Sequence, residues 1–191
     1  MCTQMTFIKD PRPDKNNESV IKEAVDMLYP DIAKWLVDGG DKVETEEEIE
    51  SIKKDVVSSV KYSYCSLHDA YEICKHLDGY GWVPDQELVD IMSNFSFKFE
   101  SAYSKQLLKW IGENNIRPKF SVGDKVKFKV LGGIQGGEIS KVYEDRAQYS
   151  IYCESLGHVK TGTGTHGVIL NFEDVEELNK EMENLNEIQE A

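Results

Sequence analysis

The sequence predicts an α+β protein with a helical part, a small β-barrel and an acidic C-terminal helix. Apolar residues recur at helical spacing up to about residue 117 and again after residue 171. Between these points they alternate with polar residues, as in half-buried strands. We therefore predict a helical domain at 1–117, a barrel at 118–171 and an acidic amphipathic helix or tail at 172–191.

The helical domain is predicted from several amphipathic stretches. The first, residues 18–40, contains Pro30, which costs an interior helix a backbone hydrogen bond, so we predict a break there. Thr45 and Glu48 have the spacing of a capping box and predict the start of another helix. The longest stretch contains "SNFSFKF", which alternates like a strand. One continuous helix and a helix broken near 93–99 therefore both remain open.

The barrel is predicted from short alternating segments. In "FSVGDKVKFKV" the inward positions are Phe120, Val122, Val126, Phe128 and Val130, and the outward ones are Lys125, Lys127 and Lys129. "AQYSIYC" repeats the alternation and places on one side Ala147, Tyr149, Ile151 and Cys153. Glycine-rich turns such as "GGIQGG" separate the segments, and short strands at close spacing favour a small barrel.

Charge is unevenly distributed along the chain. The total of 35 acidic and 22 basic residues gives a net charge of −13. Residues 1–117 hold 22 acidic and 14 basic residues (−8), residues 118–170 hold 5 and 7 (+2), and residues 171–191 hold 8 and 1 (−7). An acidic surface repels nucleic acid at long range and favours a protein partner with a basic surface.

The first residues lack the apolar run of a signal peptide, and no stretch approaches the roughly 18 apolar residues of a membrane span. The four cysteines have no framework spacing. We therefore expect a cytoplasmic protein with free thiols and no contact with membranes.

Motifs for metal binding and catalysis are weak. Cys65, His68, Cys74 and His76 invite a zinc site, but on one helix Cys65 and His76 would lie roughly 16 Å apart. His166 in "TGTGTHG" is a candidate acid or base, yet no nucleophile stands beside it in the sequence. We expect no metal, no cofactor and no enzymatic activity.

Two charged groups are the candidate binding sites, and each has two interpretations. The acidic group imitates nucleic-acid phosphates or is only a solvated surface; its members are Glu46, Glu47, Glu48, Glu50 and Asp55. The lysine row contacts phosphates with help from tyrosines, or it keeps the strand soluble and contacts the acidic tail; its members are Lys125, Lys127 and Lys129. For the lysines we favour the second interpretation.

Four stretches, in the order "FSVGDKVKF", "GGEISKVYE", "AQYSIYC" and "GVILNFEDVEEL", resemble small SH3-like barrels of the Tudor and KOW kind. A helical, acidic chain joined to such a barrel also resembles small proteins of phages and other mobile elements, which implies an accessory or inhibitory role. We therefore expect a non-catalytic interaction protein, in its most concrete form an anti-CRISPR-like inhibitor of a host nucleic-acid enzyme that acts by binding or charge mimicry. The alternative is an accessory protein that binds nucleic acid through the lysine-bearing face.

Overall fold

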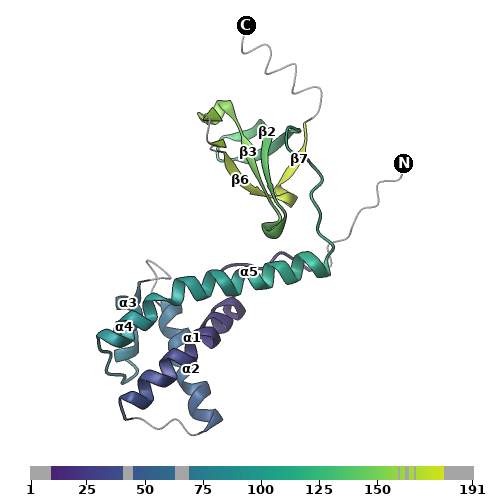
Figure 1. The fold of residues 1–191 in the computed structure, drawn as a ribbon. Coiled ribbons are helices and arrows are strands. Elements are labelled where there is room, and N and C mark those ends of the chain that lie inside the picture. Colours follow the sequence, from purple (N-terminus) through teal and green to yellow (C-terminus); the bar gives the residue numbers. More distant parts are fainter. Residues whose placement is uncertain are drawn as a thin grey trace. The chain divides into compact units, whose positions relative to one another are not determined.

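The computed structural model describes residues 10–40, 45–62, 69–158, 160–161, 164–165 and 167–178. It confirms an α+β protein, with helices in the first half of the chain and a curled antiparallel sheet in the C-terminal part (Figure 1). The chain divides into two compact units. A helical unit comprises Pro11–Leu107, and a sheet unit is formed mainly by the residues from Leu108 onward. The boundary expected at residue 117 stays a prediction.

The helical unit packs its helices around one apolar core. They are α1 (Glu18–Asp38), α2 (Glu46–Tyr62), α3 (Ala70–Asp78), α4 (Gln86–Ser93) and the first part of α5 (Phe95–Glu113). Each of them contributes buried side chains to this core, which include Val20, Leu28, Ile32, Val56, Val60, Ile73, Leu77, Leu88, Met92 and Phe95. Complete burial of one such side chain stabilises a fold by about 1.5–3 kcal/mol, so this shared core holds the helices together.

The break expected at Pro30 is wrong, because α1 continues through this residue to Asp38. Proline costs an interior helix about 3 kcal/mol. Leu28 and Ile32, one on each side of it, are both completely buried, and their packing offsets that cost. A break does occur later in the chain, at Asn94 between α4 and α5.

Polar contacts fix where α2 begins and how it meets α1. The capping box is confirmed, since the Glu48 N–H donates to Thr45 Oγ1 (3.2 Å) and the Thr45 N–H donates to Glu48 Oε2 (3.0 Å). At the other end of α2, Lys61 Nζ lies 2.6 Å from Oε2 of Glu18, the first residue of α1. Hydrogen bonds from Lys61 and Lys22 lower the pKa of Glu18 to about 2.

The sheet unit contains five antiparallel strands in the order β6-β3-β2-β1-β7 (Figure 1). The strands are β1 (Lys125–Val130), β2 (Gly133–Tyr143), β3 (Gln148–Tyr152), β6 (Val168–Asn171) and β7 (Val175–Glu177). The strands β4 (Lys160–Thr161) and β5 (Gly164–Thr165) form a separate hairpin. In chain order, β1 is the first strand of the main sheet and β7 is the last, and these two strands pair with each other.

The alternation read from the sequence is confirmed in part: Val130 is only partly buried, and Ser150, between Tyr149 and Ile151, is buried as well. Val126 and Phe128 are buried, and on the β3 side so are Ala147, Tyr149, Ile151 and Cys153. The inward position assigned to Val122 is wrong, because β1 begins only at Lys125 and Val122 is 64% exposed.

Tyr149 joins the segment before β1 to the core of the sheet. Its hydroxyl accepts hydrogen bonds from the N–H groups of Lys119 (2.9 Å) and Phe120 (3.1 Å). Its ring lies with its centroid 4.4 Å from that of Phe172. Tyr149 therefore connects two segments, the one before β1 and the 3-10 turn before β7, to the core of the sheet.

The β1–β2 hairpin is confirmed, but its turn consists of Leu131 and Gly132, and the rest of "GGIQGG", residues 133–137, belongs to β2. A Cβ atom at Gly137 would lie 2.6 Å from both Ile151 Cγ2 and the Tyr152 carbonyl oxygen. Close packing of β2 against β3 therefore requires glycine at this position.

The acidic helix expected from residue 172 does not begin there. Phe172–Asp174 form a 3-10 turn and Val175–Glu177 form β7. The apolar residues Phe172 and Val175 are buried in the sheet core, and that packing favours a strand over the helical spacing of the sequence. The rest of the expected helix, residues 179–191, lies outside the described residues.

Candidate partner-binding surfaces

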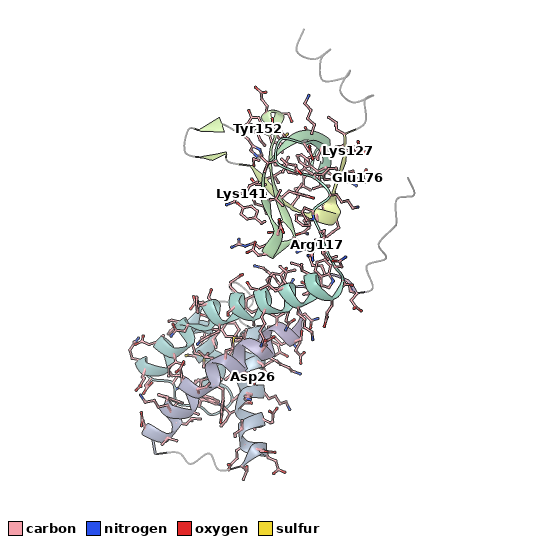
Figure 2. All side chains as sticks on the ribbon, turned by 45° about the vertical axis from the view of Figure 1, so that its right-hand side comes forward. Asp26, Arg117, Lys127, Lys141, Tyr152 and Glu176 are labelled. Atoms are coloured by element: carbon pink, nitrogen blue, oxygen red, sulfur yellow. The ribbon has the colours of Figure 1, made fainter. Side chains whose placement is uncertain are left out.

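The lysine row lies on β1, between strands that carry carboxylates. Lys127 Nζ lies 3.2 Å from Glu176 Oε2 on β7, and its side chain is only 20% exposed. Lys125 is opposite Glu138 of β2 in the strand register. Figure 2 shows Lys127 and Glu176 on the same side of the sheet. The interpretation that the lysines contact the acidic segment after residue 171 therefore holds for Lys127, while Lys125 and Lys129 are exposed.

A second basic group surrounds Tyr143 at the other end of β2. Lys141 Nζ lies 4.6 Å from the centre of the Tyr143 ring, and the Arg146 guanidinium carbon lies 5.8 Å from it. Both distances permit cation–π attraction. Of the tyrosines that could stack on a base, Tyr149 is completely buried, whereas Tyr143 and Tyr152 are partly exposed.

The acidic group on α2 does not form a single array of carboxylates. Glu48 is engaged in the capping box, and Asp55 Oδ2 accepts a hydrogen bond from the indole N–H of Trp82 (3.2 Å). Glu46, Glu47 and Glu50 are exposed on the first turns of the helix. Negative side chains at this end also stabilise a helix through its dipole, so their position has a purely structural explanation as well.

Two tryptophans from distant segments stack on the helical unit. Trp35 comes from α1 and Trp82 from the loop between α3 and α4; their ring centroids are 6.1 Å apart and their planes differ by 6°. Each indole N–H donates to a carboxylate. Trp35 Nε1 lies 3.0 Å from Asp85 Oδ1, and Trp82 Nε1 lies 3.2 Å from Asp55 Oδ2. Sequence reasoning missed this pair, because no periodic pattern marks a loop residue that stacks on a helix.

Two other residues of the loop that contains Trp82 have exposed apolar side chains. Tyr80 is 48% exposed and Val83 is 83% exposed, while both tryptophans are partly exposed. We refer to Trp35, Tyr80, Trp82 and Val83 as the tryptophan patch. Partly exposed tryptophan and tyrosine beside carboxylates have the composition of a protein-binding surface, with an apolar centre and a polar rim.

Asp85 has several contacts at the edge of the patch. Its Oδ1 atom also accepts the N–H of Leu88 (2.9 Å) and so caps α4. The buried Cys74 thiol lies nearby: burial, with a contribution from the charge of Asp85, raises its pKa to about 11. A thiol in that state is a poor nucleophile, so Cys74 belongs to the core.

A shallow depression lies beside α1 on the same unit, lined by Ser19, Lys22, Glu23, Asp26, Met27 and Lys105. Its charged groups are compensated. Glu23 lies 2.7 Å from Lys105, and Asp26, labelled in Figure 2, lies 2.7 Å from Lys53. This surface therefore offers a ligand less uncompensated charge than the tryptophan patch.

Within the described ranges, no three or more His, Cys, Asp or Glu residues are grouped so that they could hold a metal ion. Cys65, His68 and His166 lie outside those ranges. In the sheet unit, His158 Nδ1 accepts the backbone N–H of Cys153 (3.1 Å), and the Cys153 thiol is buried next to Ser155 Oγ (3.0 Å). These contacts bind a loop to the end of β3 and do not present a nucleophile to solvent.

None of the described helices has the length and apolar character needed to cross a membrane. No protein-family model, curated protein or solved structure matches the chain. What the protein does must therefore be inferred from its own residues.

Proposed function

We propose that the protein is a non-catalytic interaction protein whose partner is a protein with a basic surface. The observation that carries this proposal is the distribution of its charges. In a chain with a net charge of −13, Lys127 of the lysine row pairs with Glu176, whereas Glu46, Glu47 and Glu50 face solvent. Exposed charge of one sign attracts the opposite charge at a distance and increases the rate of association.

In its most concrete form, the proposed activity is inhibition of a nucleic-acid enzyme of the host of a phage or mobile element. An anti-CRISPR-like protein would occupy the basic groove that normally holds the phosphates. We further propose that the sheet unit is an SH3-like barrel. The pairing of the last strand with the first and the 3-10 turn before the last strand support this assignment. The free, buried thiols of Cys74 and Cys153 support a cytoplasmic location.

The test begins with capture of partners by the full-length protein from a lysate of its host cell. The association rate of a captured protein is then measured at low and high salt. We expect a basic partner whose association slows at high salt and slows in the triple variant E46Q/E47Q/E50Q. The matched control, E144Q/E154Q/E177Q, removes the same charge from exposed positions of the sheet unit and should have a smaller effect. A rate that is independent of both salt and the α2 carboxylates would refute charge mimicry.

Nucleic-acid binding is the second candidate, and the contacts of Lys141 and Arg146 with Tyr143 favour it, because cations beside a partly exposed ring can hold phosphate and base together. Gel shifts with single- and double-stranded DNA and RNA test this function. Micromolar binding that is lost in K141Q/R146Q or in K125Q/K127Q/K129Q would establish it in place of the first proposal.

A further inference from the structure

We propose that the tryptophan patch is the surface on which the helical unit binds an arginine-bearing, partly apolar segment of its protein partner. This inference rests on the proposed function and specifies the chemistry of the partner. Its basis is a partly exposed pair of tryptophans that pack against the core of the helical unit. Within the described residues, no cation of this chain lies within ion-pair distance of the carboxylates beside this pair.

The geometry of the pair first identifies the surface. The two indole rings are held parallel by hydrogen bonds to Asp85 and Asp55, so their orientation is fixed before any partner arrives. Tyr80 and Val83, which precede and follow Trp82 in the same loop, are themselves exposed. Preorganised tryptophan and tyrosine at the centre of an interface contribute much of its binding energy, since they lose little conformational entropy on binding.

The carboxylates around the patch then identify the charge of the occupant. Asp85 uses Oδ1 for both of its hydrogen bonds, and Asp55 uses Oδ2 for the one from Trp82. In each case the donor is a neutral N–H group, and the negative charge is not cancelled. Asp31 and Asp38 are exposed one helical turn before and after Trp35, on the same side of α1.

Within four residues of Trp35 the only basic residue is Lys34, which lies about 100° away around the helix. The carboxylates Asp31, Asp38, Asp55 and Asp85 near the tryptophans disfavour the phosphates of nucleic acid.

Arginine fits both the indole rings and the carboxylates of the patch better than lysine does. Its planar guanidinium can lie against the face of an indole and donate two parallel hydrogen bonds to one carboxylate, whereas an ammonium group is a compact, strongly hydrated charge. The exposed Val83 and Tyr80 favour an apolar neighbour of that arginine in the bound segment. The predicted occupant is thus a short protein segment in which arginine alternates with apolar residues.

The chain contains its own control for the test, because its three tryptophans give three separate indole N–H signals in an NMR spectrum. Trp35 and Trp82 report on the patch. Trp110 is buried in the sheet unit, with its indole N–H donating to the Asp10 carbonyl (2.8 Å). Full-length protein is titrated with three acetylated, amidated peptides of the sequences Gly-Arg-Leu-Arg-Gly, Gly-Lys-Leu-Lys-Gly and Gly-Glu-Leu-Glu-Gly.

We expect the arginine peptide to shift the Trp35 and Trp82 signals and to leave the Trp110 signal unchanged. The lysine peptide should bind at least threefold more weakly, and the glutamate peptide should not bind. No shift at millimolar arginine peptide would overturn the proposal. So would equal binding of the glutamate peptide, or an equal shift of all three signals.

Two double variants then test separately the negative charge and the exposed apolar side chains of the patch. D55N/D85N keeps the hydrogen-bond acceptors of both indoles and removes only charge; Y80S/V83S removes exposed apolar area without touching the core. Each double variant should weaken the arginine peptide about tenfold, and the control E144Q/E154Q should change it less than twofold. Unchanged affinity in both patch variants would refute the assignment. If the association of a basic partner is still slowed in E46Q/E47Q/E50Q, the proposed function holds and only the role of the tryptophan patch is refuted.

Discussion

The two units of the molecule differ in what surrounds their exposed charges. In the sheet unit, Lys127 pairs with Glu176 across two strands, and Lys141 and Arg146 lie against Tyr143. On the helical unit, the carboxylates beside the stacked tryptophans accept hydrogen bonds only from neutral N–H groups of the described residues. The net charge of the whole chain conceals this difference. A partner responds to charge that the fold leaves uncompensated, and beside the stacked tryptophans that charge is negative.

The largest effect expected from a single substitution is the loss of Phe128 from the core of the sheet unit. Phe128→Ala should lower the free energy of unfolding by about 3–5 kcal/mol, because it opens a cavity at a buried position of β1. Leu131→Ala is the matched control on the same hairpin, since Leu131 is fully exposed and its loss should cost almost nothing. Urea titration followed by fluorescence gives both values.

The same titration, followed by helical circular dichroism, asks how independent the two units are. If the helical signal of Phe128→Ala is lost at the same urea concentration as the sheet signal, then the two units unfold as one. The cations of the sheet unit and the carboxylates beside the tryptophans would then belong to two surfaces of one cooperative fold.

A pair of glycine substitutions should have the next largest effect. Gly137→Ala would place a methyl group 2.6 Å from Ile151 Cγ2 and from the Tyr152 carbonyl oxygen, so β2 and β3 must separate. We expect a cost of about 1–3 kcal/mol, typical of overpacking. Gly132→Ala in the same hairpin meets nothing within 4 Å and should change stability by less than about 0.5 kcal/mol. Equal midpoints of thermal unfolding for the two variants would contradict this packing.

Some of these structural features could be predicted from the sequence, and others could not. Local periodicity identified the strand alternation around Val126 and Phe128, and the capping box at Thr45, because both depend on neighbours in the sequence. It failed at Pro30, where burial of the flanking residues outweighs the cost of proline in a helix. It failed again at Val175, whose spacing fits a helix but whose backbone pairs with β1.

The candidate site was only partly accessible to sequence reasoning for the same physical reason. The exposed positions of Glu46, Glu47 and Glu50 could be anticipated from a helix face. The contact between Trp35 and Trp82 joins residues 47 positions apart, and it follows only from the packing of α1 against a loop. The Lys127–Glu176 pair likewise depends on a strand that the sequence presented as a helix.

A smaller effect is expected from the pH dependence of the Glu18 pair on the helical unit. The pKa of Glu18 falls from an ordinary 4.5 to about 2 in the folded protein. Because the folded pKa lies below the unfolded one, the pair contributes stability above pH 4.5, and this contribution is lost as the pH falls toward 2.

Glu18→Gln should therefore unfold at a lower urea concentration than the wild type at pH 7, and the difference should shrink toward pH 2. Because Glu18 is exposed, added salt should reduce the difference at pH 7 as well. A difference that is the same at both pH values would show that Glu18 acts through packing, and that charge compensation on this side of α1 contributes little.

The smallest effect should come from the lysine row, and it tests the compensated side of the comparison. Lys127→Gln removes one partly exposed ion pair with Glu176, so its cost should be about 0.2–1 kcal/mol. The triple variant K125Q/K127Q/K129Q should cost little more, because Lys125 and Lys129 point to solvent. Glu176→Gln should have the same effect as Lys127→Gln, and combining the two should not add to it. Additive losses in that double-mutant cycle would mean that the two side chains do not stabilise each other. Lys127 would then be uncompensated like Lys125 and Lys129, and nucleic acid would become the better candidate for the partner of the lysine row.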